Sequence, residues 1–141
     1  MASLIVFLDA SVILAGLASP HGGSSLLFKA AKKKKITLIT TPLVINEVNR
    51  HLIKLKVKPS LLKTLLDRRI VNLVADPPET LIKRCRRLTA DPDDAHVLAG
   101  AVITSARFLL SLDKKHLVTS RTNKYLRPMR VLTPKQFWQR L

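Results

Sequence analysis

The sequence predicts an α/β fold, a three-layer α/β/α sandwich with a mainly parallel central sheet. Short apolar runs alternate along the chain with longer segments of helical pattern, and this alternation is typical of strand–helix–strand units. The runs are continuously apolar, as expected for strands that are covered on both faces. The length of 141 residues and the 47% of hydrophobic residues suit one domain, residues 1–141, with a substantial core.

The first half of the chain is expected to hold two strands and three helices. The run SLIVFLD (3–9) is rich in β-branched and apolar residues and predicts the first strand, which a turn and a Gly/Pro loop follow. Serines at the start and lysines at the end favour a helix over 24–35, before a second strand at 36–41. A helix with proline in its first turn is expected over 42–55, and a basic helix over 59–70.

The second half contains three more apolar runs and three more helical segments. The runs predict strands at 70–76, 107–113 and 129–133. The stretch between the last two strands is expected to be a basic loop. Helices are predicted over the remaining segments, at 77–88, 92–106 and 134–141.

The apolar N-terminal run also has the small-residue ending of a secretory signal peptide. However, no basic residue precedes it, and Asp9 lies in its middle. A carboxylate in the middle of a membrane costs about 2.5–3.5 kcal/mol. We therefore interpret the run as a buried strand followed by a turn, and we expect a cytoplasmic protein with no membrane partner.

The chain is strongly basic, with 25 Lys and Arg against nine Asp and Glu, a net charge of +16 and a pI near 10.9. Such a charge favours polyanions, so nucleic acid is the first candidate partner and an anionic membrane surface is the second. Generic basicity, as in a solubility adaptation, is the alternative that needs no partner. The single cysteine, Cys85, excludes an internal disulfide and a cysteine-based zinc site.

Four of the scarce acids are predicted to meet at the carboxyl edge of the sheet. Asp9 and Asp113 each end a predicted strand, and Asp94 opens the helix that leads into the strand ending at Asp113. In a parallel sheet the strands end, and the following helices begin, at one edge, and ligands bind there. Glu47 lies early in the helix after the second strand, near the same edge.

Each acid taken alone has a simpler interpretation. Asp9, Asp94 and Asp113 can each cap a helix or lie in its first turn. Glu47 can pair with a lysine, and Asp76 is expected to cap the helix at 77–88. Together, however, four carboxylates a few ångströms apart cannot all stay ionised without a cation. Oxygen ligands favour Mg²⁺ or Mn²⁺ at such a site.

Four motifs carry a resemblance to a known family. The segments FLDASVIL, TPLVINEV, DPDDAHVLAGAV and LLSLDKKHL resemble, in order and over nearly the whole chain, the acidic motifs of PIN-domain ribonucleases. The SPHGGSSLL loop and the form DPDDAHVLA are similar to the toxin (VapC-like) branch of that family in toxin–antitoxin systems. No single motif is specific, so the ordered set carries the resemblance. It implies a metal-dependent endoribonuclease acting on single-stranded or structured RNA, an antitoxin partner and a homodimer.

The resemblance assigns roles by motif position. It implies Mg²⁺ (or Mn²⁺) as the cofactor, held by the catalytic acids Asp9, Glu47, Asp94 and Asp113. Auxiliary roles near these acids fall to Ser11, Asp91, Asp93 and Ser111.

Three positions refine or depart from the family's pattern. Asp94 is preferred to Asp93 because Leu98, Ala101 and Ser105 then share its helix face. Ala10 stands where Thr or Ser usually follows the first acid. Leu112 stands where Gly often precedes the fourth acid.

The basic segment after the fourth acid is the expected RNA contact. Tyr125 in this segment either stacks on a base or packs beneath the loop. Four histidines are each expected to be structural or surface residues; His96 is expected to face away from Asp94, and His116 is a candidate phosphate contact. The expected RNA-binding residues are Lys114, Lys115, Arg121, Lys124, Arg127 and Arg130.

Two functions stay open at this point. A metal-dependent endoribonuclease would use its cation to polarise a phosphate oxygen and to activate water. A non-catalytic PIN-like module would bind RNA without cutting it. A nucleotide-binding α/β protein is disfavoured because the chain has no GxxxxGK[ST] loop.

Overall fold

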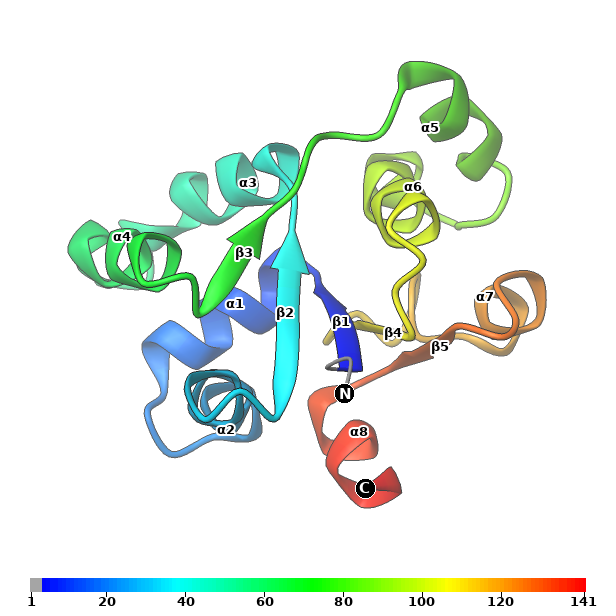
Figure 1. Cartoon of the computed structure of the whole chain (residues 1–141). Coiled ribbons are helices and arrows are strands. Elements are labelled where there is room, and N and C mark those ends of the chain that lie inside the picture. The colour runs from blue at the N-terminus through cyan, green and yellow to red at the C-terminus, as the bar shows by residue number, and fades with distance from the viewer. Residues whose placement is uncertain (1–3) are drawn as a thin grey trace.

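The chain is built around a five-stranded parallel sheet, as a computed structural model that describes residues 4–141 shows (Figure 1). The order of the strands is β3-β2-β1-β4-β5, and every pairing is parallel. The predicted α/β/α fold with a parallel sheet is thus confirmed, while Ser3, part of the first predicted strand, lies outside the described residues. The strands are β1 (Leu4–Leu8), β2 (Ile36–Thr40), β3 (Val71–Leu73), β4 (Phe108–Leu110) and β5 (Arg130–Leu132).

Helices cover both faces of the sheet. In Figure 1, α1 to α4 lie on the side of β1 that holds β2 and β3, and α5 to α7 lie on the side that holds β4 and β5, while the last helix packs against α2 and β5. They are α1 (Ala10–Ala18), α2 (Gly23–Lys32), α3 (Pro42–Leu52), α4 (Pro59–Asp67), α5 (Glu79–Cys85), α6 (Ala95–Ile103), α7 (Ser120–Tyr125) and α8 (Pro134–Arg140). No helix among residues 4–141 combines the length and the hydropathy needed to cross a membrane.

The chain reverses its direction across the sheet beside β1. It passes from β1 through β2 to β3, and then returns to β4 on the other side of β1. Right-handed crossovers therefore place the helices before and after this return on opposite faces. Ligands of open α/β sheets bind at such a reversal, outside the carboxyl ends of the strands.

The centre of the sheet is closed from water by close helix packing. Val6, Phe7 and Leu8 of β1 are fully buried. A Cβ added at Gly100 of α6 would lie 2.8 Å from Cζ of Phe7 and 3.3 Å from Cγ2 of Thr41. Glycine thus lets α6 lie directly on β1, and this contact fixes the acidic turn at the start of α6 relative to the end of β1.

Two helices replace segments that were predicted to be irregular. The turn predicted after the first strand is wrong, because α1 starts at once with Asp9 as its N-cap, where Oδ1 accepts a hydrogen bond from the Ala10 N–H. This segment is apolar almost throughout and therefore shows no helical period. The prediction of a continuous basic loop is also wrong, because α7 lies within it. Thr119 caps α7 by accepting a hydrogen bond from the Thr122 N–H.

Several predicted ends move by a few residues. The strands expected at 70–76 and 107–113 are each only three residues long, and the helix expected at 92–106 begins as a 3₁₀ turn (Pro92–Asp94). Ser105 lies beyond α6 with a φ of 54°, so it does not share the helix face of Asp94 as expected. The expected role of Asp76 as a cap of the following helix is wrong as well, because α5 has Pro78 as its N-cap and Asp76 Oδ1 instead accepts from the Leu43 N–H in the first turn of α3 at 3.0 Å.

Candidate active site

Asp9 is the most buried acid of the site. It follows β1 directly, and only 5% of it is exposed. Its Oδ1 accepts from the Ala10 N–H at 2.8 Å, and its Oδ2 accepts from the hydroxyls of Ser11 at 3.0 Å and Ser111 at 2.7 Å. Burial raises the pKa of Asp9, and these three donors offset part of that rise.

The two serines join the end of β1 to the turn after β4. The Ser111 hydroxyl accepts from the Asp113 N–H, and the Ser11 hydroxyl accepts from the Leu112 N–H, each at 3.0 Å. Leu112 is not among the four described non-glycine residues with a positive φ, and its side chain points to solvent. A side chain is therefore tolerated where the family often has glycine. Ala10 contributes its backbone N–H alone, so a hydroxyl there is not needed for these bonds.

Asp113 lies three residues beyond β4, in a tight turn. Its Oδ1 accepts from the backbone N–H groups of Lys115 at 3.1 Å and His116 at 2.9 Å, and its Oδ2 lies 3.1 Å from Nδ1 of His116. Burial alone would raise the pKa of Asp113. The hydrogen bonds from the backbone and ring of His116 and from Lys115 outweigh burial and hold this pKa below its usual value.

Asp94 combines burial with a lack of side-chain hydrogen bonds among the described residues. Its Oδ2 is buried and has no hydrogen-bond partner among the described residues. Burial is the largest cause of a pKa raised to about 7, and the charges of Asp9 and Asp113, then those of Asp91 and Glu47, add to it. An acid with this pKa is about half ionised at neutral pH unless a cation is bound.

Glu47 approaches the same group from α3. It is half-buried, and burial followed by the charge of Asp9 raises its pKa, against the effect of Arg50 and His51. The four acids expected from the sequence are therefore brought together at the carboxyl edge of the sheet. They come from four separate elements or turns, as the topology predicted.

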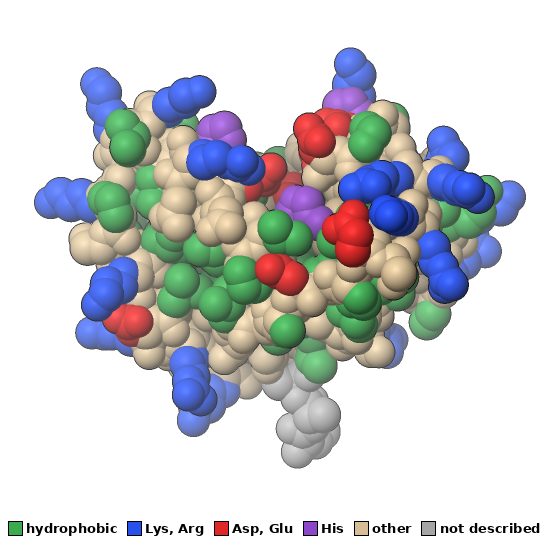
Figure 2. Space-filling model, turned by 90° about the horizontal axis from the view of Figure 1, so that it is seen from above, with side chains coloured by type: hydrophobic (Ala, Val, Ile, Leu, Met, Phe, Trp, Pro, Cys, Tyr) green, Lys and Arg blue, Asp and Glu red, His purple; other side chains and the backbone are tan. Residues whose placement is uncertain are grey.

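A groove runs from these acids along α1 and α3. It has a volume of about 360 Å³, and Ser11 and Glu47 line it together with Leu14, His51 and Lys54. Figure 2, which looks down on this edge, shows acids and histidines gathered in a hollow, with Lys and Arg side chains around its margin. A phosphate chain would therefore meet carboxylates at the floor of the hollow and cations at its rim.

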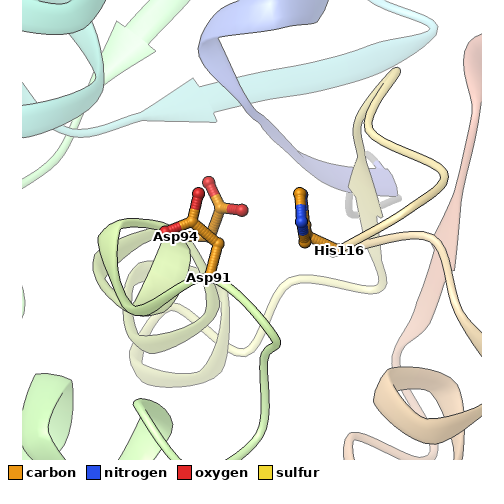
Figure 3. Close-up of side chains that lie close together, drawn as sticks. All are labelled: Asp91, Asp94 and His116. Carbon is orange, nitrogen blue, oxygen red and sulfur yellow. The ribbon is translucent and has the colours of Figure 1, made fainter.

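Asp94 also belongs to a second group of possible metal ligands, together with Asp91 and His116. One oxygen each of Asp91 and Asp94 and one ring nitrogen of His116 lie within 4.8 Å of one another. Figure 3 shows the two carboxylates side by side, with the imidazole facing them across a gap. The Thr89 hydroxyl donates to the His116 carbonyl at 3.2 Å and ties this turn to the loop before α6. From the sequence, His116 was expected to be a structural or surface residue and was a candidate phosphate contact, but it was not expected to be a metal ligand. Its position three residues after Asp113 was the signal available in the sequence.

Asp93, the remaining auxiliary acid, and His96 lie near the cluster but differ in burial. Asp93 is exposed, and its charge adds to the rise in the pKa of Glu47. His96 is half-buried, and its Nδ1 has no partner among the described residues. Burial lowers the pKa of His96, and the charge of Asp9 opposes this. The charge of the acid cluster thus acts on His96, although His96 was expected to face away from Asp94.

The expected RNA-binding cations divide between the two edges of the sheet. Lys114 and Lys115 lie in the turn that holds Asp113, at the acidic edge. Arg127 and Arg130 line a cavity of about 570 Å³ near the start of β5, which is the opposite edge. The remaining two, Arg121 and Lys124, are exposed on α7.

Tyr125 ends α7 and does not pack beneath the segment. It is 61% exposed, so that alternative is wrong and its ring is accessible to a base.

The donor set fits a hard divalent cation. Each carboxylate oxygen can accept about two hydrogen bonds or ligand contacts. Asp9 has one such place left on Oδ1, Asp113 has one on Oδ2, and Asp94 has both on its orphaned Oδ2. These free positions, together with the crowding that raises the pKa of Asp94, are what a bound Mg²⁺ or Mn²⁺ would satisfy.

Comparison with known proteins identifies a family and a fold. A family model described as PIN domain matches residues 5–115. Among solved structures, PAE2754 from Pyrobaculum aerophilum is similar with a TM-score of 0.62 and 17% identity, covering 96% of this chain and 88% of that one. No curated protein sequence matches the chain.

Two further structures are similar over most of their length. VapBC2 from Rickettsia felis, bound to a DNA fragment from their promoter, gives a TM-score of 0.60 at 18% identity, over 92% of this chain and 97% of that one. VapC20 from Mycobacterium tuberculosis, a sarcin-ricin loop cleaving toxin, gives 0.56 at 14% identity, over 78% and 91%. At such identities the likeness concerns the fold alone.

Proposed function

The chain belongs to the PIN domain family, and on this premise we propose that it is a metal-dependent endoribonuclease. It would hydrolyse phosphodiester bonds in single-stranded or structured RNA. The observation that carries the proposal is the orphaned, buried Oδ2 of Asp94, whose pKa the charges of four other acids raise further after burial. Such crowding is stable when a cation occupies the group. The proposed metal ligands and catalytic acids are Asp9, Glu47, Asp94 and Asp113, with Mg²⁺ or Mn²⁺ as the ion.

The side chains divide the work of such a site. When bound, the ion polarises a phosphate oxygen and lowers the pKa of a water molecule. Asp9 is held in one orientation by three hydrogen bonds, and Asp113 by three more. Carboxylates that are held in this way need little reorganisation during the reaction. Glu47 borders both the acids and the groove, so it lies where the substrate would meet the site.

The auxiliary residues act through the acids. Ser11 and Ser111 orient Asp9 by donating hydrogen bonds to it. The Ser11 hydroxyl accepts from the Leu112 N–H across the site, and the Ser111 hydroxyl accepts from the Asp113 N–H in its own turn. Asp91 accepts from the Asp93 N–H at 3.0 Å and shapes the turn that presents Asp94. We propose Ser11, Ser111, Asp91 and Asp93 as positioning residues.

Partners follow from the family and the charge. A net charge of +16 supports RNA as the substrate, with Lys114 and Lys115 nearest the acids. The similar fold of VapC20, a sarcin-ricin loop cleaving toxin, supports the role of a toxin whose partner is an antitoxin protein. A homodimer and a single domain over residues 1–141 are part of the same proposal.

The test is cleavage of labelled single-stranded RNA in Mg²⁺, in Mn²⁺ and in chelator. We expect cleavage in metal alone, and its loss in Asp9→Asn and Asp94→Asn purified in the same way. The matched control is Asp67→Asn, which removes an exposed acid paired with Lys63, far from the cluster in the sequence. It should cleave like the unchanged protein. Binding of RNA without cleavage in any metal would favour the non-catalytic module.

Metal binding is also measured without catalysis. Millimolar Mg²⁺ should raise the Tm of the protein, because the ion binds the folded cluster and not the unfolded chain. Asp94→Asn should lose most of this shift. A Tm unaffected by either metal contradicts a preformed cation site.

A further inference from the structure

The amino edge of the sheet, opposite the acids, carries a row of cations. Lys35 precedes β2 and Arg107 precedes β4, while Arg130 opens β5. The five residues of β2 span roughly 16 Å, so the two edges are about that far apart. The acid cluster therefore lies beyond the strand ends, where Lys114 and Lys115 accompany it, and further cations lie at the strand starts.

Two adjoining cavities open at this edge, between the ends of α2 and α4. Their volumes are about 410 and 370 Å³, and Lys34, Arg69, Ala31 and Ile70 line both. No acidic side chain lines either cavity. Among residues 4–141 neither Lys34 nor Arg69 forms an ion pair. Two uncompensated cations thus face one pair of hollows.

Lys34 and Arg69 also hold equivalent places in the backbone. Each follows a helix with a left-handed φ, of 59° and 55° respectively. The Lys34 N–H donates to the Ala31 carbonyl and the next N–H to the Ala30 carbonyl, and Arg69 repeats both bonds with Leu66 and Leu65. This is the Schellman motif that closes a helix.

Glycine is the usual residue at such a position, because a Cβ is disfavoured at a positive φ. No described glycine of this chain takes a positive φ. Three cations, Lys34, Lys56 and Arg69, thus occupy sites where a smaller residue would be conformationally easier, and of these Lys34 and Arg69 line the same two cavities.

Compensation of the helix dipole explains Lys34 poorly. Cations in the last turn of a helix stabilise its carboxyl end, and the last turn of α2 already holds Lys29 and Lys32. Lys34 lies past that turn and adds a cation next to Arg69 instead. A feature that keeps both side chains at the same cavities accounts for the pair better.

We propose that Lys34 and Arg69 together hold a backbone phosphate of RNA, which makes the amino edge a second RNA contact, remote from the acids. A guanidinium binds phosphate with two parallel N–H groups, and an ammonium adds a point charge. The hydroxyl of Thr37 and the amide of Asn72 lie on the wall of the smaller cavity. The proposal rests on the proposed function only in its choice of RNA, because binding here does not require cleavage.

The experiment measures RNA binding in chelator, so that a failure to cleave does not affect it. Fluorescence anisotropy of a labelled 20-nucleotide single strand is followed from 50 to 200 mM salt for the unchanged protein and for Lys34→Gly/Arg69→Gly. Each phosphate contact contributes about 0.7 to the slope of log affinity against log salt. Losing this one phosphate should flatten the curve, so that the unchanged protein loses about 2.6-fold more affinity over this range than the variant.

The same variant should fold at least as well as the unchanged protein, because glycine removes two strained backbone positions. Ser105→Gly is the matched backbone control, since Ser105 has the same motif with a φ of 54° and carries no charge. It should raise the Tm and leave RNA binding unchanged. Lys83→Ala/Arg84→Ala on α5 is the matched charge control, with one Lys and one Arg removed elsewhere.

Three results would overturn the proposal. An unchanged salt slope in Lys34→Gly/Arg69→Gly shows that the cavity residues do not bind phosphate. An equal loss in Lys83→Ala/Arg84→Ala shows that the charge acts diffusely. Loss of binding to phosphatidylglycerol vesicles with RNA binding intact shows a membrane surface as the ligand instead.

Discussion

Asp94 concentrates the conflict between burial and charge at the scale of single residues. Its pKa is raised to about 7 by burial first and by neighbouring acids second. The folded protein therefore holds a proton that the unfolded chain, with a pKa near 3.8, has already released. Stability consequently falls as pH rises from about 4 to about 7, because the unfolded state is the more ionised one in this window.

This sign gives a pH prediction for the metal-free protein. Asp94→Asn should be about as stable as the unchanged protein at pH 4 and more stable at pH 8, as measured by urea midpoints in chelator. The comparison isolates Asp94, because the lowered pKa of His96 acts in the opposite direction in both proteins. Saturating Mg²⁺ should remove the difference at pH 8. A difference that stays constant across the range contradicts the raised pKa.

The sequence predicted which acids meet, but it did not predict the hydrogen bonding of Asp94 or its contact with His116. The meeting of Asp9, Glu47, Asp94 and Asp113 followed from topology, since parallel strands end at one edge. The orphaned oxygen of Asp94 and the imidazole of His116 beside it depend on side-chain rotamers and on the packing of two turns. No spacing in a sequence fixes these.

At the scale of elements, the apolar runs predicted every strand but overstated two of them. A hydrogen-bonded ladder ends where the neighbouring strand leaves, whereas the apolar run continues, as in 107–113 against Phe108–Leu110. The helix α1 was missed because it is apolar on nearly every side. The cap role of Asp76 was missed because its partner, Leu43, is 33 residues away. Local signals therefore locate elements better than they locate ends or long-range caps.

The contact between α6 and β1 gives a prediction at this scale. Gly100→Ala should destabilise the protein by about 1–3 kcal/mol, because the new methyl meets the fully buried ring of Phe7 at 2.8 Å. Urea unfolding measures the change. The Gly100→Ala substitution should also weaken metal binding, since the turn that holds Asp94 directly precedes α6.

Gly23→Ala is the matched control for this substitution. Gly23 also lies in a helix, but its added Cβ would meet no atom closer than 3.8 Å. Alanine there should be neutral or stabilising by up to about 1 kcal/mol. Equal stability of Gly100→Ala and the unchanged protein would show that α6 moves freely on β1.

At the scale of the whole molecule, the charge of +16 acts against compactness. Like charges spread over a small surface repel, and salt screens them over about 10 Å at 0.1 M. The Tm in chelator should therefore rise between 20 and 200 mM sodium chloride, with the same curve for potassium chloride. A Tm that falls with added salt would mean that attractive pairs dominate, although only two ion pairs of Lys or Arg with an acid are present among residues 4–141.

The fold class and the family could be predicted from the sequence, whereas the positions of the cations at the two edges of the sheet could not. Composition reported an excess of cations without their places. The clustering of Lys34 with Arg69 requires two helices, separate in the sequence, to end side by side. The expected grouping of Arg127 and Arg130 with the site failed for the same reason, because the chain crosses the sheet before it reaches β5.

The hydrogen bond from Ser111 to Asp9 joins residues 102 positions apart. During synthesis on a ribosome, a nascent chain that has completed β1, β2 and β3 still lacks the strand that orients its first carboxylate. Premature termination before Ser111 would thus release fragments without an assembled centre.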